Sequence, residues 1–227
     1  MFRTIAAIAL AIRFGHPDVS EADATKYAEA LQIEAQNYDF DPLTGVAIIH
    51  RESQFRASAV SHDGEDYGLA QIRARYVGAC KNDKDPRHRP TAACRTVKEH
   101  LLDPAENIRV MAELISGHRK LCRQKTGKTE LQNWLASYQG SNSAKEGRWC
   151  TPSDGSQSVA RYRELLMREV ARRSKEIEAA DRALALRAEA RARLAGLGAE
   201  AVPVSKAALV SKAAPSPAPS GAEQRGG

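Results

Sequence analysis

Apolar residues recur at helical spacing through most of this chain. The first clear segment covers residues 21–38, with Ala24, Ala28, Leu31 and Ala35 on one face. Ser20, followed by Asp23 three residues later, is typical of a helix start. Asp41-Pro42 is a second start signal, an N-cap followed by proline in the first turn.

The segment after Asp41-Pro42 is apolar on most sides, so its helix is predicted to be central. Another helix is expected to open at Asp103-Pro104, and two more at residues 129–138 and 159–173. Residues 57–66 and 81–93 have the composition of loops. Sustained period-two alternation and Asn-Gly hairpin turns are missing from the sequence, so we expect an all-α fold of short helices with functional loops.

The first 15 residues allow two interpretations. They contain one early arginine, a short apolar run and an Ala9-Leu10-Ala11 triplet, which is typical of a weak secretory signal. They are equally typical of an amphipathic first helix that ends at Gly15. No stretch approaches the roughly 18 to 20 apolar residues of a membrane span.

The composition changes at about residue 172. Residues 172–227 are rich in Ala, Arg and Glu and hold few large apolar side chains, and residues 213–227 are predicted to be disordered. We therefore divide the chain into an N-terminal apolar segment (1–19), a catalytic domain (20–171) and a charged helical segment with a disordered tail (172–227). The last part is either a basic arm attracted to anionic polymer or an inert solvated extension.

The net charge of +6 is distributed unevenly. Residues 172–227 carry ten Lys/Arg against six Asp/Glu, whereas residues 1–171 carry 24 against 22. No basic cluster is interleaved with aromatic residues, which argues against nucleic-acid binding.

Four cysteines are widely spaced along the chain, at Cys80, Cys94, Cys122 and Cys150. None has the C-x-x-C spacing of a zinc or redox site, and the histidines add no metal-ligand spacing. An even number of such cysteines suits two disulfides in an oxidising compartment, for which we favour Cys80–Cys94 and Cys122–Cys150. Four buried free thiols are the alternative.

Glu52 lies where the apolar helix gives way to polar residues. Packing near Val46, Ile48 and Ile49 and the negative end of the helix dipole both disfavour its ionised form and raise its pKa. A raised pKa is what a general acid requires at neutral pH. A solvent-facing glutamate in the last helical turn is the alternative.

Three further motifs follow Glu52 in a fixed order. With it, the set reads Glu52-Ser53, Gly68-Leu69-Ala70-Gln71, Asn107-Ile108 and Tyr138-Gln139-Gly140. The set resembles the catalytic domain of soluble lytic transglycosylases over about residues 24–166. The resemblance implies a lysozyme-like α-helical fold.

The resemblance also implies an activity. Glu52 matches the single catalytic acid and base, which protonates the oxygen between N-acetylmuramic acid and N-acetylglucosamine. It then deprotonates the muramyl 6-hydroxyl, which closes on C1 to give a 1,6-anhydro end. The substrate's 2-acetamido group assists. Peptidoglycan strands are the implied partner, no cofactor or metal is implied, and the location is extracytoplasmic.

Five positions match substrate-binding residues of that family. Ser53 matches a serine in the cleft, Gly68 and Gln71 line the muramyl site, and Asn107 and Tyr138 match the cleft wall. The tyrosine hydroxyl is expected within reach of the catalytic carboxylate.

The sequence departs from the family pattern at several places. Ala70 stands where Met is usual, Arg73-Ala74-Arg75 where a proline is common, and Gln139 where the familiar motif has Asn. These departures affect the cleft shape and the glycan preference.

Two other functions stay open. A hydrolase on the same fold would need a second carboxylate, for which Asp63, Glu65 and Asp66 are candidates. A non-catalytic peptidoglycan-binding protein is the other, although it would have no use for a desolvated acid. The oligomeric state is not determined by the sequence.

Overall fold

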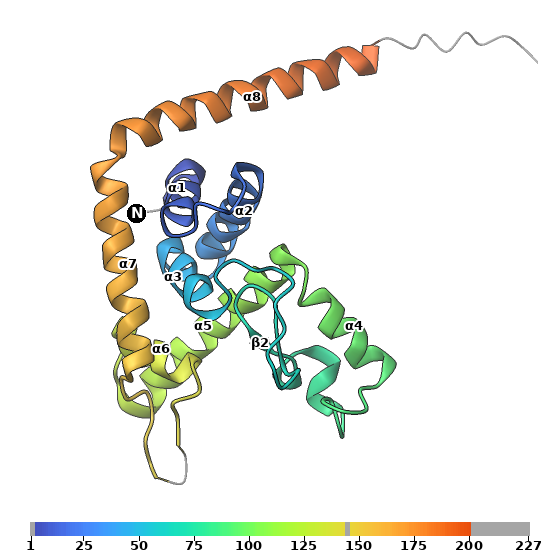
Figure 1. Cartoon of the computed structure of the whole chain (residues 1–227), viewed down its shortest axis with the longest axis vertical. Helices are drawn as coiled ribbons and strands as arrows, with labels where there is room; N and C mark the ends of the chain where they lie inside the picture. The colour runs from blue at the N-terminus through green and yellow to red at the C-terminus, as the bar shows by residue number, and fades with distance from the viewer. Residues whose placement is uncertain (1–2, 144–145, 201–227) are drawn as a thin grey trace, which may run out of the picture. The chain divides into compact units, whose positions relative to one another are not determined.

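The computed structural model describes residues 3–143 and 146–200, with side chains up to residue 194. In these residues it contains eight α-helices, one pair of two-residue strands and two 3-10 helices, which confirms the mainly helical prediction (Figure 1). The tail for which disorder is predicted lies outside the described residues.

The elements follow one another in a simple order. The α-helices are α1 (Ile5–Gly15), α2 (Glu21–Asn37), α3 (Pro42–Glu52), α4 (Ala92–His100), α5 (Pro104–Thr126), α6 (Leu131–Tyr138), α7 (Asp154–Arg172) and α8 (Ser174–Glu200). Between α3 and α4 lie β1 (Asp66–Tyr67), β2 (Ile72–Arg73), η1 (Ala74–Tyr76) and η2 (Gly78–Asn82).

The predicted helix starts are confirmed by their caps. The side chain of Ser20 accepts a hydrogen bond from the backbone of Asp23 at 3.0 Å. Asp41 and Asp103 cap α3 and α5 in the same way, each followed by a proline in the first turn. These side chains satisfy backbone N–H groups that have no partner within the helix.

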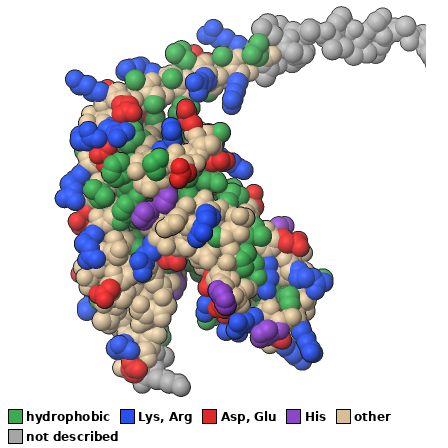
Figure 2. All heavy atoms as spheres, viewed as in Figure 1, with side chains coloured by type: hydrophobic (Ala, Val, Ile, Leu, Met, Phe, Trp, Pro, Cys, Tyr) green, Lys and Arg blue, Asp and Glu red, His purple; other side chains and the backbone are tan. Residues whose placement is uncertain are grey.

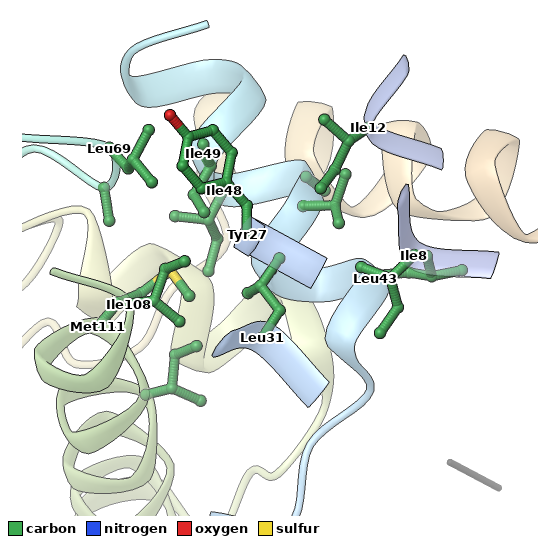
Figure 3. Packing of buried hydrophobic residues seen from close by; sticks show 14 of the residues in the cluster. Ile8, Ile12, Tyr27, Leu31, Leu43, Ile48, Ile49, Leu69, Ile108 and Met111 are labelled. Carbon is green, nitrogen blue, oxygen red and sulfur yellow. The ribbon is translucent and has the colours of Figure 1, made fainter. Parts of the chain in front are cut away.

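α3 lies at the centre of the core, as its composition predicts. Every residue from Pro42 to Ile49 is buried, and α3 contacts α1, α2, α5 and α7. Figure 3 shows apolar side chains of α1, α2, α3 and α5 gathered in one cluster. The element that ends in Glu52 is therefore held from several sides.

The N-terminal apolar segment forms α1. Ile8 and Ile12 are fully buried, and α1 packs mainly against α2 (Figure 3). The segment is thus a helix that ends at Gly15, and a role as a secretory signal remains a prediction.

Two helices differ from the sequence expectation. α4 begins inside the segment expected to be a loop, because Thr91 caps its first turn. Cys94 is the one buried residue of α4, so the helix has little apolar pattern in the sequence. α7 begins at Asp154 rather than near Val159, because Ser153 and Ser156 form a reciprocal capping box.

The chain divides by compactness after Ala185. Among the described residues, those up to Ala185 form one compact unit and those from Leu186 to Glu200 belong to another. Packing against the core of the first unit continues past α7 to Ile177 and Leu184 in α8.

Both expected disulfides are present. Cys80–Cys94 joins η2 to α4, and Cys122–Cys150 joins α5 to the segment before α7. This confirms the nearest-neighbour pairing, and all four cysteines are buried.

Within the described ranges, no helix is both long enough and apolar enough to cross a membrane.

Candidate functional site

Glu52 is the last residue of α3. The helix stops there because Gln54 and Phe55 adopt left-handed φ values of 54° and 62°. The Glu52 side chain is half-buried. It therefore stands at the carboxyl end of a buried helix, as the sequence predicts.

The pKa of Glu52 is raised above its ordinary value, chiefly by burial. A hydrogen bond from Gln139 and the charge of Arg51 act in the opposite direction, and the charge of Asp66 adds a smaller increase. Burial prevails, so Glu52 holds its proton at a higher pH than a solvated glutamate. This is the protonation state that a general acid needs.

Glu52 lines a cavity of about 940 Å³. Its walls come from the end of α3, the β1–β2 hairpin, η1, α5, the end of α6 and the start of α7. Figure 2 shows the molecular face hollowed between the side that carries α6 and the side that carries the hairpin and α4. A cavity of this size lies within the range of ligand-binding clefts.

Tyr138 lines the cavity together with Glu52. Its hydroxyl donates to the carbonyl oxygen of Ala70 at 3.5 Å. Burial raises the pKa of Tyr138, and the nearby Glu52 charge raises it further. The hydroxyl therefore stays protonated beside the glutamate. Direct contact between the Tyr138 hydroxyl and the Glu52 carboxylate remains a prediction.

Gln139 contacts Glu52 directly, which the sequence analysis does not predict. Its amide nitrogen donates to Oε1 of Glu52 at 3.4 Å. Its amide oxygen is buried and has no hydrogen-bond partner among the described residues. A Cβ at Gly155 would lie 3.0 Å from that oxygen, so the start of α7 fits closely around the amide.

Gln71 lines the cavity from the turn between the two strands. Its amide nitrogen donates to the carbonyl oxygens of Ala59 at 3.2 Å and Gly68 at 2.9 Å. These bonds hold the turn, in which Gln71 itself has a φ of 46°. Its contact with a muramyl group remains a prediction.

Gly68 and Asn107 lie behind the cavity wall rather than in it. Asn107 is fully buried and accepts from the backbone N–H of Ala70 at 2.7 Å. Its amide nitrogen donates to the carbonyl oxygens of Tyr67 at 2.8 Å and Leu101 at 2.7 Å. A Cβ at Gly68 would lie 2.3 Å from that nitrogen, and the φ of Gly68 is 73°, so the position favours glycine. The pair therefore fixes the turn that carries Gln71.

Ser53 is also buried. It is 1% exposed, and its hydroxyl points back to the carbonyl oxygen of Ile49 at 3.5 Å. It is not among the residues that line the cavity. For Ser53, Gly68 and Asn107, direct contact with substrate is a prediction, and the contacts described here support the scaffold.

The acidic loop brings one carboxylate to the cavity. Asp66 lines it, whereas Asp63 and Glu65 are not among the lining residues. Arg73 also lines the cavity, and its guanidinium lies within 4.0 Å of carboxylate oxygens of all three acidic residues. The candidate second carboxylate is therefore paired with a cation.

His118 and Tyr76 are further cavity residues that the sequence analysis does not single out. Nδ1 of His118 lies 2.8 Å from the hydroxyl of Ser137, and burial lowers its pKa, so the ring is neutral at neutral pH. Tyr76 is 61% exposed and lines both this cavity and an adjoining one of about 370 Å³. An exposed aromatic side chain at a cavity edge can cover the apolar face of a sugar. Neither residue has a spacing signal, because the fold alone brings it to the cavity.

The Cys122–Cys150 disulfide supports the wall that carries Gln139. The carbonyl oxygen of Cys150 accepts a hydrogen bond from the Asn133 side chain in α6 at 2.7 Å. The backbone N–H of Cys150 donates to Oδ1 of Asn142 at 2.9 Å. The cross-link thus ties α5, α6 and the segment after α6 together.

Across the residues that the structure describes, no three His, Cys, Asp or Glu side chains are grouped so as to hold a metal ion. His16 and His50 do approach each other at 2.6 Å between ring nitrogens, and His50 stacks on Tyr162. This pair is not among the residues lining the cavity.

Comparison with protein families agrees with this geometry. A family model described as Transglycosylase SLT domain matches residues 29–149, which include Glu52 and the five predicted substrate-binding residues. Neither the curated proteins nor the solved structures contain a significant match to the chain.

Proposed function

Because the chain belongs to the transglycosylase SLT domain family, we propose that it is a peptidoglycan lytic transglycosylase in which Glu52 is the single acid and base. The observation that carries this proposal is the position of Glu52 at the end of a buried helix, half-buried in a large cavity and with a raised pKa.

The reaction uses the two protonation states of Glu52 in turn. Protonated Glu52 donates its proton to the oxygen that joins N-acetylmuramic acid to N-acetylglucosamine, and the bond from that oxygen to C1 breaks. The 2-acetamido group of the substrate stabilises the positive charge at C1. Ionised Glu52 then takes the proton of the muramyl 6-hydroxyl, whose oxygen bonds to C1. The proton balance closes without water.

Gln139 and Tyr138 support both states. The Gln139 amide donates to the ionised carboxylate that forms after the first proton transfer. The Tyr138 hydroxyl remains neutral close by, so it adds no negative charge against Glu52. Burial favours the protonated form of the resting carboxyl.

Two further properties belong to the proposal. The family and the two disulfides favour an extracytoplasmic location, where peptidoglycan lies and disulfides persist. We also propose that residues 20–171 contain the catalytic domain, that residues 172–227 are an extension, and that no cofactor is needed.

The first test is digestion of purified peptidoglycan with product analysis by mass spectrometry. We expect muropeptides that end in 1,6-anhydro-N-acetylmuramic acid. Glu52→Gln should lower turnover by about 100-fold or more while glycan binding is retained, because a positioned acid contributes about that much. Glu29→Gln, the same change at an exposed position of α2, is the matched control.

Other products would favour the two other functions. Ordinary reducing ends from the native protein would identify a hydrolase. Binding without any product, from a folded protein, would identify a peptidoglycan-binding module. Unchanged turnover in Glu52→Gln would exclude Glu52 as the acid.

A further inference from the structure

Asp66 and Arg73 are directly opposite each other in the β1–β2 hairpin. Residues opposite each other in an antiparallel pair project to the same side, so their side chains meet. Nε of Arg73 donates to Oδ1 of Asp66 at 2.9 Å, and Nη2 donates to Oδ2 at 3.0 Å. Both oxygens of Asp66 are therefore engaged by one guanidinium, the geometry that most restricts a carboxylate.

The register that places them there is fixed from behind. Asn107 bonds the backbone of Tyr67 and Ala70, on either side of the left-handed Gly68. A shift of one residue would carry Asp66 and Arg73 to opposite sides of the hairpin. The ion pair is thus a consequence of the hairpin register.

This ion pair lies in the cavity that also contains Glu52. Asp66, Arg73 and Glu52 line the same cavity. The negative charge of Asp66 also contributes to the raised pKa of Glu52. A second carboxylate near the acid is what a water-activating glycosidase requires.

We propose that Arg73 determines the outcome of the reaction by binding Asp66 and so preventing it from activating water. This inference rests on the proposed lytic transglycosylase activity. With Asp66 held, the muramyl 6-hydroxyl is the acceptor at C1, and the product is an anhydro ring. Arg73 also occupies one of the positions at which the sequence departs from the usual family pattern.

The competing route is chemically complete once Asp66 is free. Glu52 gives its proton to the leaving oxygen, and the bond from that oxygen to C1 breaks. Asp66 takes a proton from water, and the oxygen of that water bonds to C1. The product is then a reducing end that contains one oxygen from solvent, and one water molecule is consumed.

The other acidic residues do not provide this route as directly. Asp63 and Glu65 lie 3.5 Å and 3.7 Å from Arg73 atoms, but neither lines the cavity. Arg75 lies 3.9 Å from Glu65 and does not line the cavity either. It is therefore a matched control for Arg73.

The test is digestion of peptidoglycan in water enriched in oxygen-18, with the ratio of labelled reducing ends to anhydro ends measured by mass spectrometry. The full chain and the variants Arg73→Ala, Arg73→Met, Arg75→Ala and Arg73→Ala/Asp66→Asn are compared. Arg73→Met keeps most of the side-chain length without the guanidinium. Thermal unfolding and circular dichroism check that each variant is folded.

We expect both Arg73 variants to raise the labelled fraction by about tenfold or more, since a positioned general base contributes at least that much. The double variant should return to the native ratio, because the base has been removed, and Arg75→Ala should match the native protein.

Three outcomes would overturn the inference. In the first, the ratio is unchanged in a folded, active Arg73 variant. In the second, the double variant keeps the labelled ends. In the third, neither Arg73 variant folds or turns over, which would make Arg73 a requirement for structure or turnover. The native digest separately tests the proposed function, because labelled ends as its main product would refute that function whatever the variants do.

Discussion

Glu52 is subject to opposing influences on its charge. Burial and Asp66 favour the protonated form, whereas Gln139 and Arg51 favour the ionised form. An acid that must later act as a base needs both states within reach, so neither influence can be extreme. The hydrogen bond from Gln139 is the larger of the two that favour ionisation.

Replacing Gln139 should therefore change the pH dependence of the reaction. Gln139→Leu removes the donor to the Glu52 carboxylate, so the pKa of Glu52 should rise. Glu52 then remains protonated to higher pH. The alkaline limb of the plot of kcat against pH should therefore shift to higher pH. Because a stabiliser of the ionised state is lost, kcat should fall by about tenfold.

The control is Gln132→Leu, the same change at an exposed position of α6. Its pH profile should match that of the native protein. If the alkaline limb of Gln139→Leu does not move although kcat falls, Gln139 acts on something other than the protonation of Glu52.

At the scale of elements, the position of Glu52 depends on how α3 is held. α3 packs against α1, α2, α5 and α7, and Arg163 of α7 bonds its N-cap, Asp41, at 2.8 Å. The hairpin opposite is fixed to α5 through Asn107. The two sides of the cavity are therefore positioned by separate contacts with the long helix α5 and its neighbours.

α1 is predicted to be a stabilising part of this arrangement. Ile8 is fully buried in the core, so Ile8→Ala should lower the free energy of unfolding by about 2 to 5 kcal/mol. Ile33→Ala makes the same change at a site that is 55% exposed and should have little effect. Denaturant unfolding measures both. Equal effects of the two variants would show that α1 does not contribute to the stability of the folded protein.

At the scale of the whole molecule, the excess of basic residues is greater, relative to length, outside the compact unit that holds the core. The compact unit ends at Ala185, and residues 186–227 carry six Lys/Arg against three Asp/Glu. Figure 2 also shows basic side chains distributed along α8 and α7. A basic extension is attracted to an anionic polymer over a distance that shrinks with salt, about 10 Å at 0.1 M and 3 Å at 1 M.

Removal of residues 186–227 should therefore weaken binding to peptidoglycan sacculi at low ionic strength and make little difference near 1 M salt. Co-sedimentation of the full chain and of residues 1–185 measures this, with turnover of soluble glycan fragments as the control for folding. Equal binding at low salt would identify the extension as inert for wall attachment. An equal loss at both salt concentrations would indicate a contact that is not electrostatic.

Much of the fold can be predicted from the sequence because its signals are local. An N-cap oxygen meets a donor two or three residues away, so Ser20, Asp41 and Asp103 identify helix starts without knowledge of the rest of the chain. α4 is missed because it has few apolar residues to mark a face.

Part of the site is predictable for the same reason. The burial of Glu52 follows from its place at the end of an apolar helix, and the motifs around it indicate the family. Gln139 and Arg73 are outside that prediction, because each acts through a partner that only the fold brings near, Glu52 across 87 residues and Asp66 across a turn.

The sequence by itself determined the helical class and the acid at the end of α3, since these depend on short-range pattern and on residue types. It only favoured the disulfide pairing, which the tertiary structure confirmed. The tertiary structure decided which side chains meet at that acid. It placed Ser53, Gly68 and Asn107 in the scaffold, and it brought Gln139 to Glu52 and Arg73 to Asp66. The physical reason is that a hydrogen bond or an ion pair depends on distances of a few ångströms, which are fixed by the packing of helices far apart in the chain.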